Sequence, residues 1–189
     1  MKIEEQIKQK LEEAIEILKK FGMPTEQQNE RTAYCLLSLL NVTPEKEWKN
    51  AESPLVGITP MMTFAKDYYN KEYAPNTRET FRRFSTHQMV QAGIVLYNPD
   101  KPDRPVNSPK AVYQISPAAL KVIKAYKTNA FESLLTDFIK NQSTLSAQYA
   151  HEREMNMVSV RIKENHSIQI SPGKHSELIR DIITRVQNV

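Results

Sequence analysis

The chain has 189 residues, of which 40% are hydrophobic and 25% are charged, and these values are ordinary for a soluble globular protein. Its 26 Lys and Arg against 22 Asp and Glu give a net charge of +4, which indicates nucleic-acid binding only if the charge is clustered. A single cysteine excludes an internal disulfide, and no apolar run approaches the roughly 20 residues of a membrane span, so we expect a cytoplasmic protein with no membrane partner.

The N-terminal part of the chain predicts two helices joined by a short turn. Apolar residues recur at helical spacing from Ile3 to Phe21, and Gly22 supplies a stop. A second and more apolar helix is expected from Glu26 to Leu40, and it contains the single cysteine, Cys35, as a buried thiol. The loop that follows is expected to hold a short helical piece around Trp48.

A helix and a turn come next. Thr59 and Pro60 suit the N-cap and the first position of a helix that continues to about Asn70. The aromatic residues of this region are expected either to support the turn or to pack in the core, and they are Tyr68, Tyr69 and Tyr73.

The segment from Asn76 to Ala92 predicts a second helix with two different faces. Asn76 and Glu79 have the N-x-x-E spacing of a capping box, and Gly93 supplies the stop. On a helical wheel, the packing face consists of Phe81, Phe84, Ser85, Gln88, Met89 and Ala92. The opposite face is polar and basic, with Arg78 at its border, and consists of Glu79, Thr80, Arg82, Arg83, Thr86 and His87.

Two short strands and a rigid loop follow this helix. Strands are expected at Ile94–Tyr97 and Ala111–Ile115, and the prolines in NPDKPDRPVNSPK hold the loop between them extended. A basic helix followed by a strand, a loop and a returning strand is the order of a recognition helix and its wing. The wing residues that can reach DNA are Lys101, Arg104, Asn107, Ser108 and Lys110.

These groups suit duplex DNA. Arginine can donate two hydrogen bonds to guanine O6 and N7, and hydroxyl groups can bind bases or phosphates. The residues expected at the major groove are Arg78, Arg82, Arg83, Thr86 and His87, and Thr80 of the same helix is also expected to bind DNA. Those expected at the DNA backbone or the minor groove are Arg104, Asn107, Ser108 and Lys110. A basic helix can also be simply a solvated surface, and winged helices also serve protein contacts.

The C-terminal part adds further elements. The expected elements are a helix from Ser116 to Tyr126, helices at Phe131–Ile139 and Leu145–Glu154, a hairpin of Met157–Lys163 with Ser167–Ile170, and a last helix at Gly173–Val186. The predicted fold class is therefore mainly α: a helical domain with a winged helix-turn-helix core and a short β-wing, followed by a hairpin and a helix. We expect the domain boundary near residue 155, which gives units at 1–155 and 156–189.

Three segments resemble a known family. GITPMM at Gly57–Met62, the run from Tyr73 to Ile115 and SPGKHSELI at Ser171–Ile179 are similar, in the same order, to the BsuBI/PstI type of type II restriction endonuclease. The resemblance implies an N-terminal winged-helix domain that recognises duplex DNA. It also implies a C-terminal nuclease of the PD-(D/E)xK kind that requires magnesium and cleaves a short palindromic site, which favours a symmetric homodimer.

The residues of that nuclease are not found in the chain. Such chemistry needs an Asp and a second acid on adjacent strands to hold the metal, and a further group, often Lys, to activate water. Asp100 and Asp103 follow prolines, but in the wing loop, where carboxylates that cap turns are favoured. We expect no catalytic residue, metal site or cofactor here, and Ser171–Ile183 resembles only the first helix of the nuclease half.

The sequence therefore predicts a chain that binds duplex DNA without cutting it, as the N-terminal part of a restriction endonuclease. Two alternatives stay open. A non-catalytic winged-helix transcription regulator would have much the same sequence pattern. A protein-interaction module could use the same basic helix against an acidic partner.

Overall fold

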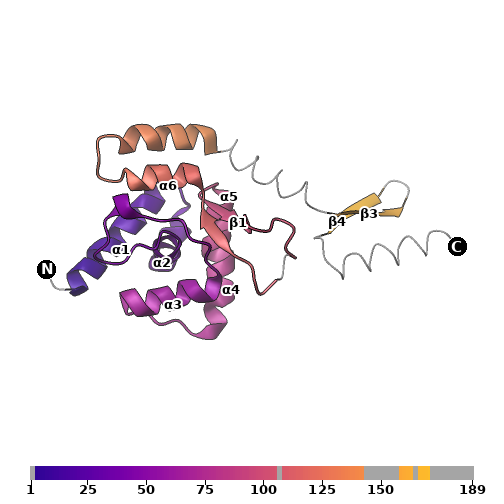
Figure 1. Cartoon of the computed structure of the whole chain (residues 1–189), viewed down its shortest axis with the longest axis horizontal. Helices are drawn as coiled ribbons and strands as arrows, with labels where there is room; N and C mark the ends of the chain where they lie inside the picture. The colour runs from indigo at the N-terminus through magenta and orange to yellow at the C-terminus, as the bar shows by residue number, and fades with distance from the viewer. Residues whose placement is uncertain (1–2, 106–107, 143–157, 164–165, 171–189) are drawn as a thin grey trace.

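The structure, a computed structural model, describes residues 3–105, 108–142, 158–163 and 166–170. Figure 1 shows the helices of the first two ranges gathered around one centre, with the wing loop projecting from one side. Among the described helices, none has both the length and the apolar character that crossing a membrane requires.

Helix α1, Ile3–Lys20, ends as the sequence predicts. Gly22 has a φ of +75°, which is the left-handed conformation that glycine adopts without strain. Its N–H donates to the carbonyl of Lys19 at 3.0 Å, and the N–H of Met23 donates to Leu18 at 3.1 Å. These two bonds satisfy carbonyls at the end of the helix that would otherwise lack partners.

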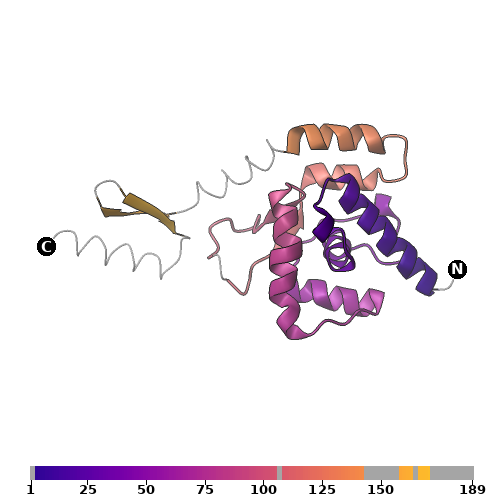
Figure 2. The same cartoon turned by 180° about the vertical axis from the view of Figure 1, so that it is seen from behind.

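The predicted helix over Glu26–Leu40 is wrong in its first turn. Thr25–Gln27 forms a 3₁₀ turn, η1, and helix α2 covers only Glu30–Leu39. The reason is Asn29, which is extended and caps the helix by accepting a hydrogen bond from the N–H of Thr32 at 3.0 Å. Helix α2 is the centre of the fold: Figure 2 shows it end-on between α1, α3 and the helix that carries α4 and α5.

The connection to helix α3 is partly as expected. Trp48–Asn50 forms the short helical piece, η2, with the Trp48 side chain buried. Helix α3 spans Ile58–Tyr69, so the predicted N-cap at Thr59 is wrong: Gly57 holds that position, and Pro60 lies within the first turn. Proline is tolerated there because the first N–H groups of a helix have no partner within it.

Two of the three aromatic residues near the turn pack in the core. Tyr69 is buried and donates its hydroxyl to the carbonyl of Val42 at 2.7 Å. The ring of Tyr73 meets that of Phe81 edge to face, with 4.8 Å between centroids. Tyr68 is 48% exposed, so it does not belong to the core.

The second helix of the pair is continuous but irregular. It consists of a 3₁₀ turn η3 (Pro75–Thr77), helix α4 (Arg78–Phe81), a π-helical turn η4 (Arg82–Thr86) and helix α5 (His87–Gln91). We call these four elements together the recognition helix. Gly93 ends it with a φ of +68°, and the N–H of Ile94 donates to Met89 at 3.0 Å, as the predicted stop requires.

The predicted wing strands are confirmed. Strand β1 (Val95–Tyr97) pairs antiparallel with β2 (Tyr113–Ile115), and Tyr97 lies opposite Tyr113. Val56, just before α3, bridges to Tyr113 from the other side. The small sheet therefore joins the wing to the segment that leads into the helix-turn-helix.

Two helices complete the described helical part. Helix α6 spans Pro117–Lys124, with Ser116 as its N-cap and proline at its first position, and a further helix covers 131–142. Both helices confirm the prediction, although α6 ends two residues earlier than expected and the second helix extends beyond Ile139. The predicted helix at Leu145–Glu154 lies outside the described residues.

The C-terminal hairpin is confirmed. Strand β3 (Val158–Lys163) pairs antiparallel with β4 (His166–Ile170), and Val158 lies opposite Ile170. The last predicted helix, Gly173–Val186, lies outside the described residues. The division into units at 1–155 and 156–189 stays a prediction.

The buried carboxylate of Glu13 connects helix α1 to η2 and to the segment that follows α6. Glu13 on α1 accepts hydrogen bonds from Trp48 Nε1 at 2.7 Å and from Lys127, which follows α6. Gln9 donates to it at 2.9 Å, and the Lys10 ammonium is 3.6 Å away. Burial acts to raise the pKa of Glu13, but these partners outweigh it and hold the pKa below its ordinary value.

Replacing Glu13 by Gln should lower the free energy of unfolding by about 1–3 kcal/mol at neutral pH, because Lys127 loses its buried charged partner. A lowered folded-state pKa gives stability that is present above the unfolded-state value of 4.5 and is lost as the pH falls through the folded-state value. Urea unfolding of both proteins should therefore give a difference that shrinks below about pH 4.5.

The matched control is Glu12→Gln. Glu12 is on the same helix, but its side chain is 65% exposed and its partner Lys8 lies 4.0 Å away. This change should leave stability nearly unchanged at every pH. An equal effect of both variants would show that Glu13 is not the buried partner described.

Candidate nucleic-acid interface

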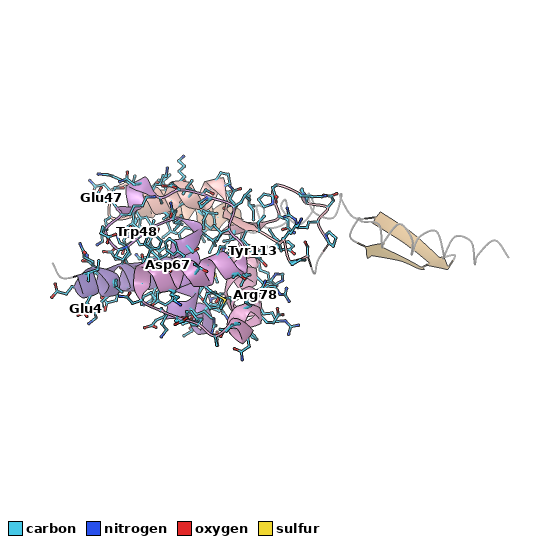
Figure 3. All side chains as sticks on the ribbon, turned by 60° about the horizontal axis from the view of Figure 1, so that its bottom comes forward. Glu4, Glu47, Trp48, Asp67, Arg78 and Tyr113 are labelled. Atoms are coloured by element: carbon cyan, nitrogen blue, oxygen red, sulfur yellow. The ribbon has the colours of Figure 1, made fainter. Side chains whose placement is uncertain are left out.

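A groove lies between the start of the recognition helix and the wing. Its volume is about 650 Å³, and the recognition helix contributes three arginines and one acid to its walls, namely Arg78, Arg82, Arg83 and Glu79. Tyr97, Ser108 and Pro109 line it from the wing. Figure 3 shows Arg78 on the side of the domain from which the wing loop also projects. Three guanidiniums against one carboxylate make this groove electropositive.

Glu79 pairs with two of these arginines. Arg82 donates from Nε at 2.8 Å and from Nη2 at 2.6 Å, one bond to each carboxylate oxygen. The Nε of Arg83 is 2.8 Å from Glu79 Oε1. The hydrogen bond from Arg82 and the charges of both guanidiniums hold the pKa of Glu79 below its ordinary value.

The predicted capping box is therefore wrong. Thr77 holds the N-cap position of α4 without a side-chain hydrogen bond, and Asn76 lies inside the preceding 3₁₀ turn. The carboxylate of Glu79 binds guanidiniums instead of the helix start. Sequence spacing alone suits both uses, and the nearby arginines decide between them.

The π-helical turn changes which residues face outward. A π turn adds one residue to a helical turn, which rotates the following residues by about 100° relative to a regular α-helix. Phe81 is fully buried, as predicted, but Phe84 is 52% exposed, so its placement on the packing face was wrong.

Thr86 was predicted on the exposed face of the helix, but it lies on the buried face. It is completely buried, and its hydroxyl donates to the carbonyls of Phe81 and Arg82, each at 3.0 Å. The Arg82 carbonyl lies at the first residue of the irregular turn and the Phe81 carbonyl directly before it, so Thr86 helps to stabilise the turn. Thr86 cannot contact a base from this position, and it leaves the set of candidate DNA-binding residues.

Ser85 locks the same turn onto α2. It is fully buried, its Oγ accepts a hydrogen bond from Arg31 Nε at 3.1 Å, and it lies 3.0 Å from Thr32 Oγ1. Cys35 is buried beside this cluster, and burial raises the pKa of its thiol to about 12. The recognition helix is thus fixed in rotation by hydroxyl contacts, while its arginines stay at the surface.

The remaining predicted residues of the helix keep some exposure. Arg78 and Arg83 are exposed, while Thr80, Arg82 and His87 are partly exposed. Of these, Arg78, Arg82 and Arg83 line the groove, whereas Thr80 and His87 do not. The structure therefore brings together three of the five residues expected at the major groove.

The wing is braced from within by Arg104. Its Nη1 donates to Asn98 Oδ1 at 2.8 Å, and its two Nη groups bind the Asp100 carboxylate at 3.0 and 2.6 Å. The side chain is only 12% exposed. The loop itself uses the hydrogen-bonding groups of Arg104, and the expected contact of Arg104 with a DNA phosphate stays a prediction.

Asn98 anchors this brace to the sheet. Its backbone is left-handed, with a φ of +50°, and its Oδ1 also accepts from the N–H of Val112 at 2.9 Å. Hydrogen bonding from Arg104 holds the pKa of Asp100 below its ordinary value, so this acid serves the turn. Within the described ranges, no group of three or more His, Cys, Asp or Glu residues could hold a metal ion.

The outer part of the wing keeps its polar groups available. Lys110 is exposed and Ser108 is partly exposed, and the Ser108 hydroxyl accepts from the N–H of Lys110 at 3.2 Å. Asn107 lies outside the described residues. The sequence did not predict that Asn98 binds Arg104 and Val112 or that Arg31 binds Ser85, because no local pattern indicates these partners.

A pair of phenylalanine variants tests the rotation of the helix. Phe81→Ala should lower the free energy of unfolding by about 3–5 kcal/mol, because it empties a fully buried position. Phe84→Ala should change it by less than about 0.5 kcal/mol. Both values are measured by urea unfolding followed by circular dichroism. Similarly large losses of stability in both variants would show that Phe84 is also buried, as a regular helix predicts, and would contradict the π turn.

Comparisons with known proteins converge on one group. The family model of the BsuBI/PstI restriction endonuclease HTH domain matches residues 8–147. Type II restriction enzyme BsuBI of Bacillus subtilis is 60% identical over 92% of this chain and 55% of its own length. Type II restriction enzyme AplI of Arthrospira platensis is 34% identical over 94% of this chain and 54% of its own length.

A solved structure agrees with these matches. The structure of SdaI restriction endonuclease superposes with a TM-score of 0.68 at 30% identity, over 92% of this chain and 55% of that one. The chain thus spans about half the length of the relatives that it matches.

Proposed function

We propose, since this chain belongs to the BsuBI/PstI restriction endonuclease family, that its helical part recognises a specific sequence in duplex DNA for a type II restriction endonuclease. The observation that carries the proposal is the groove beside the wing, where three arginines surround one carboxylate. Guanidiniums on a helix next to a wing match both surfaces of duplex DNA, because the helix fits the major groove and the wing reaches the backbone.

The proposed contacts are fewer than the sequence suggested. Arg78, Arg82 and Arg83 face the major groove, and Lys110 and Ser108 meet the phosphate backbone. Thr80 and His87 flank the helix contacts, and Asn107 stays in the proposal as a wing contact outside the described residues. The groove lining supports Arg78, Arg82, Arg83 and Ser108, and exposure supports Lys110.

The properties of the whole enzyme are also part of the proposal. Magnesium-dependent cleavage of a palindromic site, a symmetric homodimer and a cytoplasmic location are what such an enzyme would require. The named relatives are restriction enzymes, which favours this function over a transcription regulator or a protein-interaction module.

Binding of the full chain to duplex DNA tests the proposal. A duplex selected by the chain from a random library should bind in fluorescence anisotropy, and the logarithm of affinity should fall linearly with the logarithm of salt concentration. Changing Arg78 and Arg82 together to Ala should weaken binding at least about tenfold, because each base contact is worth about 1–3 kcal/mol.

The matched control changes Lys121 and Lys124 to Ala. These two exposed lysines of α6 lie outside the groove, so the same loss of charge should have a much smaller effect. Absence of binding to any duplex at low salt would refute the proposed function. Equal losses in both double variants would place the DNA surface elsewhere.

A further inference from the structure

Glu79 is shared unequally between its two arginines. Arg82 is held side-on, because both its Nε and its Nη2 bind the carboxylate. Arg83 approaches the same carboxylate through Nε, which is 2.8 Å from Glu79 Oε1. The exposure of the two side chains agrees, at 37% for Arg82 and 65% for Arg83.

The Arg83 side chain, which is 65% exposed, carries the groups that can bind guanine. Two parallel N–H groups at the tip of a guanidinium fit the O6 and N7 acceptors of guanine in the major groove. Because Glu79 holds Arg83 at Nε, the side chain has less freedom to lose when it binds a base. A lysine in the same place would keep the charge but lose the fork.

The Glu79 carboxylate also weakens non-specific binding to DNA phosphates. It lies in the groove wall between the guanidiniums that a phosphate would approach, and its charge repels phosphates. It neutralises part of the charge of both arginines, so the two guanidiniums attract phosphates less strongly. Non-cognate DNA offers phosphates everywhere but the right acceptor pair only at certain guanines.

We infer that Glu79 is a specificity determinant: it positions the terminal nitrogens of Arg83 to read a guanine, and it weakens the grip of Arg82 and Arg83 on non-cognate DNA. This inference rests on the proposed function, because it concerns the same groove. It assigns the groove a preferred ligand, a guanine at one position of the recognised duplex.

The first test compares Glu79→Gln with the unchanged chain. Affinities are measured for the selected duplex and for a scrambled duplex over a range of salt concentrations. Without the carboxylate, binding to the scrambled duplex should tighten by about threefold or more, with a salt dependence steeper by up to about one log–log unit. The ratio of selected to scrambled affinity should fall by about tenfold, which is the size of one bidentate base contact.

The second test removes single acceptor atoms from the DNA. Each guanine of the selected duplex is replaced in turn by 7-deazaguanine, which lacks N7. The unchanged chain should lose at least about fivefold in affinity at one guanine. The Arg83→Lys variant should bind the unmodified duplex at least about fivefold more weakly than the unchanged chain does. Its affinity should not fall further when 7-deazaguanine replaces that guanine.

The control is Glu72→Gln. Glu72 is exposed and paired with Lys66 at 2.6 Å, but it lies outside the groove, so the same charge change should leave the affinity ratio unaltered. Circular dichroism checks that each variant is folded, and Glu79 is exposed enough that folding should persist.

The possible results distinguish a failure of the proposed DNA recognition from a failure of the role inferred for Glu79. No binding to any duplex would overturn the proposed function itself. Specific binding with an unchanged affinity ratio in Glu79→Gln would overturn the inference alone. Equal weakening on both duplexes would also overturn it, because that result would show a purely structural role for the carboxylate.

Discussion

The π-helical turn at Arg82–Thr86 is the constraint on which the rest of the interface depends. Thr86 donates to the carbonyls of Phe81 and Arg82 where the turn begins, and Ser85 is fixed to Arg31 and Thr32 of α2. These buried hydroxyl contacts set the rotation of the helix about its axis. Because of that rotation, Phe84 is exposed and Thr86 is buried, while Arg82 and Arg83 stay at the surface where the turn begins. π turns are known to occur at functional sites.

The wing is positioned by a second polar device. Asn98, in a left-handed conformation, accepts from both Arg104 and the backbone of Val112, and Asp100 binds Arg104 from the other side. This brace gives a proline-rich loop a defined shape next to the recognition helix. Polar contacts therefore hold both walls of the groove, which limits the entropy lost when a ligand binds.

Much of the fold could be predicted because its signals are local. Glycine stops at Gly22 and Gly93, the Ser116 cap and the alternation of apolar residues each depend on neighbours a few positions away. The errors arise where a distant partner decides. Asn29 shortens α2, the arginines draw Glu79 away from the predicted capping box, and the π turn reverses the faces of Phe84 and Thr86. A helical wheel assumes a regular period and cannot show such a turn.

Hydrogen–deuterium exchange of the full chain, with and without its selected duplex, tests the central claim most directly. The account predicts slower backbone exchange in the recognition helix around 76–84 and in the wing around 108–112. The outer face of α1, on the other side of the α2 core, should be unaffected. Protection confined to α1 or α6, with none in the recognition helix and wing, would contradict the assignment of this groove as the DNA-binding surface.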